Sequence, residues 1–160
     1  MNPGAPPPQP YPGWSTIRDR CRAMGMPTWR TDTVGAIIDE PVEPGLAGLW
    51  LRSGHMSDLI VKAGRIAVDQ PRPQIIVPFK GCRLLPLVDQ IRRRKTGTTL
   101  AMALAPDSLD APEFAEACRS AGLDESPTRA TLRRFATLDG AAAEQVFQLL
   151  QWMSRDLSTL

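Results

Sequence analysis

Three polar side chains in the second half of the sequence are of types that could perform chemistry together. Lys80, Asp107 and Asp139 each follow a segment with the pattern of a strand, and open parallel sheets bind ligands outside the carboxyl ends of their strands. A lysine with two aspartates could hold a metal ion or a phosphate, which makes an α/β enzyme one alternative. Aspartates at such positions also serve as ordinary turn and cap residues, so the pattern by itself does not require catalysis.

Other motifs for phosphate binding and nucleophilic catalysis do not occur in the sequence. It contains neither G-x-x-x-x-G-K-S/T nor G-x-G-x-x-G, and it has no G-x-S-x-G. The single histidine, His55, could act as an acid or base, but no serine or cysteine motif accompanies it. Cys21, Cys82 and Cys118 are far apart and odd in number, which favours a reducing, cytoplasmic compartment. We therefore predict no metal and no cofactor, and we favour a non-enzyme.

A basic cluster offers a nucleic-acid alternative. The cluster consists of Arg92, Arg93, Arg94 and Lys95, which could neutralise phosphates. The cluster also lies at the carboxyl end of a predicted helix, where the helix dipole favours cations without any ligand. Residues 81–160 hold ten basic and ten acidic residues, so this half of the chain has no net charge that would attract nucleic acid. A second route to nucleic acid is a helix-turn-helix over residues 111–135, which requires residues 128–138 to be helical.

The last predicted helix, which begins near Gly140, is unusually apolar. Only Glu144, Arg155 and Asp156 are charged in it, and such a helix is either central to the core or covered by a partner. The sequence has four tryptophans, a residue type that is enriched at binding hot spots and is also common in cores. We expect a protein partner or self-association. The residues predicted to contact it are Phe147, Leu150, Trp152 and Met153.

Length and composition indicate one domain that positions these residues. The chain has 160 residues, a formal net charge of +2 and 42% hydrophobic residues, which suits a folded protein without a dominant charge. No apolar run is long enough for a membrane span, and the proline-rich start differs from a secretory signal. Nine of the 16 prolines fall within the first 45 residues. We expect a disordered proline-rich tail at 1–13 and a single α/β domain at 14–160.

The first half of that domain is predicted to contain a helix and a β-hairpin. A helix over 15–24 ends at a glycine, and a short apolar run at 46–51 is consistent with a strand. Two apolar runs within residues 59–68 flank the glycine-containing segment Lys62-Ala63-Gly64-Arg65, which is a hairpin signal.

The second half alternates between strand and helix patterns. The predicted strands are 74–79, 98–105 and 131–138, and the predicted helices are 84–95, 110–121 and the one from Gly140. This order predicts a β-α-β-α-β-α three-layer core with a parallel sheet over about 74–157. Residues 128–138 are ambiguous, because Ser126 and Pro127 could also begin a helix there. We favour the strand, because Asp139-Gly140 then makes the usual break before the next helix.

The order of these segments resembles one known family. LLPLVDQIRRR, TTLAMALAPDSL, SAGL, TLRRFATLDG and AAAEQVFQLL follow the layout of SulA-type cell-division inhibitors over residues 75–153. Those proteins are degenerate relatives of the RecA fold that bind FtsZ and lack a nucleotide loop. The proline-rich start, the predicted hairpin and the missing last strand depart from the family, and no functional residue is carried over. The resemblance implies an α/β sheet that works by binding, and we expect a non-enzymatic adaptor, regulatory subunit or inhibitor.

Overall fold

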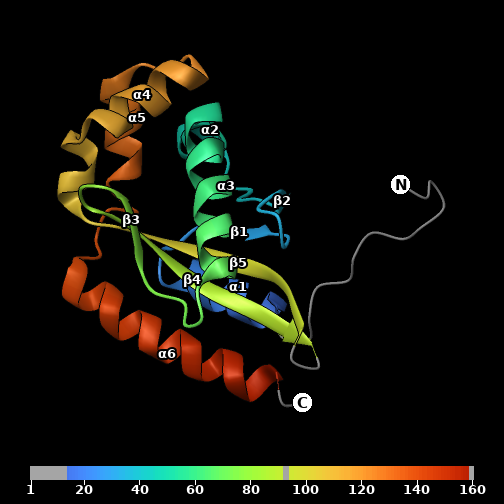
Figure 1. Ribbon diagram of the computed structural model, residues 1–160. Helices are drawn as coiled ribbons and strands as arrows, with labels where there is room; N and C mark the ends of the chain where they lie inside the picture. Colours follow the sequence, from blue (N-terminus) through green and yellow to red (C-terminus); the bar gives the residue numbers. More distant parts are fainter. Residues whose placement is uncertain (1–13, 92–93, 159–160) are drawn as a thin grey trace.

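One antiparallel sheet organises the chain in the computed structural model, which describes residues 14–91 and 94–158. The predicted tail at 1–13, with Arg92 and Arg93 of the basic cluster, lies outside these described residues. The five strands have the spatial order β2-β1-β5-β4-β3 (Figure 1). Their bounds are β1 Thr28–Thr31, β2 Ile37–Asp39, β3 Ile76–Phe79, β4 Cys82–Ile91 and β5 Arg94–Leu104.

All four strand pairs are antiparallel, so the predicted parallel β-α-β-α-β-α core is wrong. The decisive segment is β4, for which the sequence predicts a helix over 84–95. Its apolar residues fit a helical stripe, but they fit equally well a strand that is buried on both faces. Ile91 pairs with Arg94, and a connection this short permits only an antiparallel pair.

Helices cover both faces of the sheet. On the first face, buried side chains of α2 (Gly45–Leu51), α3 (Gly54–Asp69), α4 (Pro112–Ala121) and α5 (Glu125–Leu132) pack against Leu84, Leu100 and Met102. A short 3₁₀ helix, η1 (Pro106–Asp110), leads from β5 into α4. Figure 1 shows α2, α4 and α5 gathered at one end of the molecule, away from the C-terminal helix.

The predicted strand at 46–51 and hairpin at 59–68 are both wrong, because these residues belong to α2 and α3. The Ser53 hydroxyl caps α3 by accepting a hydrogen bond from the Met56 N–H at 3.3 Å. Gly64, which resembles a turn glycine in the sequence, faces β1 instead. A Cβ at Gly64 would lie 2.6 Å from the Thr31 Oγ1 atom, so the missing side chain permits close packing of helix on strand.

On the second face lie α1 (Trp14–Ala23) and α6 (Gly140–Ser158). Ile17 and Cys21 of α1, with Phe147 and Leu150 of α6, pack against the alternate side chains of β4 and β5, including Leu85. Within the described residues, no helix is long and apolar enough to cross a membrane.

Several predicted elements are confirmed, and one ambiguity is resolved. Helices occur close to the predicted 15–24, 110–121 and the segment from Gly140, and β3 and β5 overlap the strands predicted at 74–79 and 98–105. Residues 125–132 form α5, so the favoured strand at 131–138 is wrong; the alternative helix is right for residues 128–132 only, and it begins at Glu125 rather than Pro127. Its buried residues, Thr128 and Leu132, are one helical turn apart and face α2 and α4.

Candidate functional site

The structure brings the segments of Lys80, Asp107 and Asp139 to one end of β5. The N–H of Ala105, just beyond β5, donates to the carbonyl oxygen of the β3–β4 turn at 2.7 Å. The N–H of the residue before Asp139 donates to the last carbonyl oxygen of β5 at 2.9 Å. These loops therefore share an edge of the sheet even though the strands are antiparallel.

The side chains at this edge have structural roles. Asp139 Oδ1 accepts a hydrogen bond from the Ala142 N–H at 2.8 Å and thereby caps the start of α6. Asp107 lies directly over Gly81, where an added Cβ would overlap its carboxylate. Lys80, Asp107 and Asp139 are all exposed. Across residues 14–91 and 94–158, no group of three His, Cys, Asp or Glu side chains is arranged to hold a metal ion.

The three cysteines are buried, and the single histidine lies at the start of a helix. Burial raises the pKa of Cys21 to about 12, and burial likewise raises the pKa of Cys82 and of Cys118. All three thiols therefore stay protonated at neutral pH and are poor nucleophiles. His55 lies in the first turn of α3 rather than after a strand, and its backbone N–H donates to the Ser120 hydroxyl at 3.0 Å.

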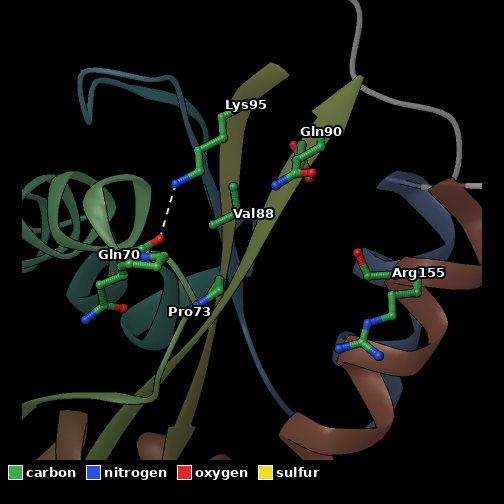
Figure 2. Close-up of a pocket in the computed structure, with 9 residues that line it drawn as sticks. Gln70, Pro73, Val88, Gln90, Lys95 and Arg155 are labelled. Carbon is green, nitrogen blue, oxygen red and sulfur yellow. Dashed lines mark hydrogen bonds between the residues drawn. The ribbon is translucent and has the colours of Figure 1, made fainter. Parts of the chain in front are cut away.

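A polar cleft of about 220 Å³ has the buried side chain of Asp89 in its lining (Figure 2). Figure 2 shows Arg155 of α6 on one side of it and Gln70 and Lys95 on the other, with Gln90 on the intervening strand. The full lining is Gln70, Pro71, Pro73, Val88, Asp89, Gln90, Lys95, Ser154 and Arg155.

Asp89 pairs with Arg30 across the central strand. The Arg30 Nε and Nη2 atoms both donate to Asp89 Oδ2, at 3.0 and 2.6 Å, and the Asp89 side chain is fully buried. The Arg30 guanidinium also lies 5.8 Å from the centre of the Trp14 ring. Burial raises the pKa of Asp89 to about 6, although the charge and hydrogen bonds of Arg30 act in the opposite direction.

The charges of this cleft hold the fold together. Lys95 Nζ donates to the carbonyl oxygens of Val68 and Gln70, so it closes the C-terminal end of α3. Asp89 lines the cleft, and Arg30 holds its Oδ2 atom, whereas its buried Oδ1 atom has no hydrogen-bond partner among the described residues. Sequence reasoning missed this pair, and the one available signal was a charged residue inside the apolar run of β4.

The geometry gives little support to nucleic-acid binding. The segment before the basic cluster is strand β4 rather than the predicted helix. Of the two described residues of the cluster, Arg94 begins β5, and Lys95 donates hydrogen bonds at the C-terminal end of α3. Helices α4 and α5 do form a helix-turn-helix around Gly122, whose φ is 68°. However, α5 has only eight residues, and residues 112–134 contain four acidic and four basic side chains. Asp124 and Glu125 stand at the start of α5, where they would repel phosphates.

The predicted partner-binding residues are divided between core and surface. Phe147 and Leu150 are buried, at 7% and 0% exposure, and pack on the sheet. Trp152 is 71% exposed, and Met153 is partly buried. Of the four tryptophans, only Trp152 is on the surface, because Trp14, Trp29 and Trp50 are core residues.

A groove of about 430 Å³ lies between α1 and α6, one of whose lining residues, Met153, follows Trp152 in the sequence. Its lining consists of Arg20, Ala23, Met24, Leu149 and Met153, and we call it the α1–α6 groove. Leu149 is itself 54% exposed, one turn from Trp152 on the same face of α6. Sequence analysis missed Leu149 because it assigned the inner stripe of α6 to the partner.

The chain matches no protein-family model, no curated protein and no solved structure. The resemblance to SulA-type inhibitors therefore stays a prediction. The antiparallel sheet differs from the parallel order which that resemblance implies over residues 75–153.

Proposed function

We propose that this protein is a non-enzymatic protein-binding module, and that the α1–α6 groove with Trp152 is its binding surface. The observation that carries the proposal is the exposure of Leu149, which lines an apolar groove, and of Trp152, which lies one turn from Leu149 on α6. Burying a leucine that now faces water contributes about 1.5–3 kcal/mol, and a tryptophan contributes at least as much through its larger area. Three buried free cysteines fit a reducing compartment, so we place the module in the cytoplasm.

Other exposed apolar side chains form a weaker alternative surface. Ile66 and Val77, at 38% and 57% exposure, border a groove of about 210 Å³ between α3 and β3. That groove is half the volume of the α1–α6 groove, and the charged Lys62 lies in its wall. Neither of its exposed residues is aromatic, whereas binding hot spots are enriched in tryptophan.

The proposal is tested with Trp152→Glu and Leu149→Glu. The matched control is Ala141→Glu, which adds the same charge to an exposed position of the same helix about two turns from Leu149. Immobilised protein is exposed to nuclease-treated lysate, and each retained polypeptide is then purified and titrated calorimetrically against all four proteins. We expect one partner to bind the wild type and Ala141→Glu equally and to bind the other two variants at least tenfold more weakly.

Two outcomes count against the proposal. One is that every retained polypeptide binds the four proteins with equal affinity. The other is that retention disappears with nuclease, which would favour a nucleic-acid partner. Thermal melts of all variants verify that weaker binding does not arise from unfolding.

A further inference from the structure

The polar cleft beside Asp89 is a separate concave site from the α1–α6 groove, because no residue lines both of them. Six of its nine lining residues carry polar or charged side chains. The cleft volume of about 220 Å³ equals the space of about seven water molecules. Polar side chains that lose contact with water need new hydrogen-bond partners, so this cleft suits a small molecule with polar groups of its own.

Two cationic side chains, Lys95 and Arg155, lie on opposite sides of the cleft (Figure 2). The Lys95 Nζ atom donates to the carbonyl oxygens of Val68 and Gln70 at 2.5 and 3.2 Å. A lysine ammonium has three N–H groups, so one of them remains for a ligand while the other two hold the ammonium in position. Arg155 is exposed on α6 and adds a second positive charge. An anionic group that enters the cleft is attracted by both side chains.

Asp89 is the one acidic residue in the lining, and it restricts which anion fits. Its Oδ2 atom accepts both hydrogen bonds from Arg30, whereas its buried Oδ1 atom has no partner among residues 14–91 and 94–158. Nearly all buried polar atoms of folded proteins have a partner, so Oδ1 indicates a missing N–H or O–H donor. Gln90 and Arg155 are exposed, and exposed side chains change rotamer within nanoseconds, which gives a small donor access to Oδ1. The Asp89 carboxylate also repels a doubly charged phosphate more than it repels a singly charged carboxylate.

We infer that this cleft binds a small carboxylic acid that carries an amino or hydroxyl group next to its carboxylate. The carboxylate of the ligand lies between Lys95 and Arg155, and its amino or hydroxyl group donates to the Oδ1 atom of Asp89. Arg30 positions the Asp89 side chain through the Oδ2 atom. This ligand site is additional to the protein-binding surface proposed above and does not depend on it.

The test titrates the isotope-labelled full chain with two matched sets of probes. L-alanine and L-lactate are compared with propionate, and L-aspartate and L-malate are compared with succinate, because each comparison adds only an amino or hydroxyl group. Chemical shifts of the backbone amides report both the affinity and the location of binding. We expect at least one amino or hydroxy acid to shift the amides of the lining residues, and to bind at least about tenfold more tightly than its matched analogue.

Three variants assign the roles of the lining side chains. In Asp89→Asn, Arg30 requires an acceptor, so the asparagine oxygen faces Arg30 and the amide N–H groups replace Oδ1. This variant should therefore lose the preference for probes with a donor. Lys95→Gln and Arg155→Gln should each weaken binding of every carboxylate by about threefold to tenfold. The matched control is Arg134→Gln, which removes one exposed positive charge just after α5, at the end of the molecule away from α6, and should leave all affinities unchanged.

Three results would overturn the inference. The first is that propionate and succinate bind as tightly as the amino and hydroxy acids, which would make the cleft a general anion site. The second is that inorganic phosphate binds more tightly than every amino and hydroxy acid. The third is that no probe shifts the amides of the lining residues at concentrations up to about 10 mM. Thermal melts verify that the variants are folded, and the exposed position of Arg155 keeps the test decisive if Asp89→Asn unfolds.

Discussion

Arg30 and Asp89 connect two strands that do not touch each other. Arg30 belongs to β1 and Asp89 to β4, which lie on opposite sides of β5, and the ion pair spans the central strand beneath α1. Trp14 covers the guanidinium, so the pair also ties the first helix to the sheet. A buried pair of this kind is costly to break on one side only, because the remaining charge stays buried.

The stability of the protein should depend on pH through Asp89. Burial raises the pKa of Asp89 in the folded state to about 6, above the value of about 3.9 that it has in an unfolded chain. The folded state therefore binds the Asp89 proton more tightly than the unfolded chain does. The stabilisation of the fold by this proton is fully present below about pH 4 and is lost as the pH rises through about 6. Urea unfolding at several pH values measures the change, which should amount to about 3 kcal/mol at most.

The matched variant for this prediction is Asp89→Asn, which keeps the shape of the side chain and does not titrate. The free energy of unfolding of the wild type should fall relative to that of Asp89→Asn between pH 4 and 6. If the difference in unfolding free energy between the two proteins stays constant, or changes in favour of the wild type, the raised pKa of Asp89 is contradicted.

Two adjacent leucines of α6, Leu149 and Leu150, differ in burial and should therefore differ in their effect on stability. Leu149 is half exposed and Leu150 is fully buried against the sheet. Leu150→Ala should lower the free energy of unfolding by about 2–5 kcal/mol, because it leaves a cavity in the core. Leu149→Ala should change it by no more than about 0.5 kcal/mol. Denaturant titration of the two variants gives the comparison, and equal losses would mean that the face of α6 is misassigned.

The turn between β3 and β4 depends on glycine for two reasons. Gly81 has φ of 79°, and an added Cβ would overlap the Asp107 carboxylate and the backbone nitrogen of Ser108. Gly122, after α4, has φ of 68° and open space around it. Gly122→Ala should cost about 1 kcal/mol for the left-handed conformation alone, and Gly81→Ala at least about 2 kcal/mol. Similar changes in the unfolding free energies of the two variants would refute the close packing at Gly81.

At the scale of the whole molecule, β5 is the centre of the structure. It pairs with β1 along residues 98–101 and with β4 along nearly its whole length, and helices cover both of its faces. Backbone amides of β5 should therefore exchange with deuterium most slowly, and those of the edge strands β2 and β3 most rapidly. Hydrogen exchange followed by mass spectrometry measures this order. Protection of β2 equal to that of β5 would contradict the strand order.

The sequence by itself determined the elements whose signals are local. Helix α4 ends at Gly122 and α6 follows a capping aspartate, so both are evident from residue order alone. The apolar, β-branched or threonine-rich runs of β3 and β5 likewise predict strands. The loops of Lys80, Asp107 and Asp139 do lie at one edge of the sheet, but not for the predicted reason, because the sheet is antiparallel and residues 133–138 form no strand.

The tertiary structure decided everything that depends on which surface covers a side chain. An apolar residue pattern indicates only that side chains are buried. Because β4 is buried on both faces, its sequence pattern cannot be distinguished from that of a buried helix. Gly64 lies within α3, where its missing side chain lets β1 approach the helix. Asp89 is tolerated in the core because Arg30, 59 positions away in the sequence, reaches it from β1. Likewise, only the packing of α6 on the sheet separates the buried Leu150 from the exposed Trp152, since contacts between distant segments have no local signature.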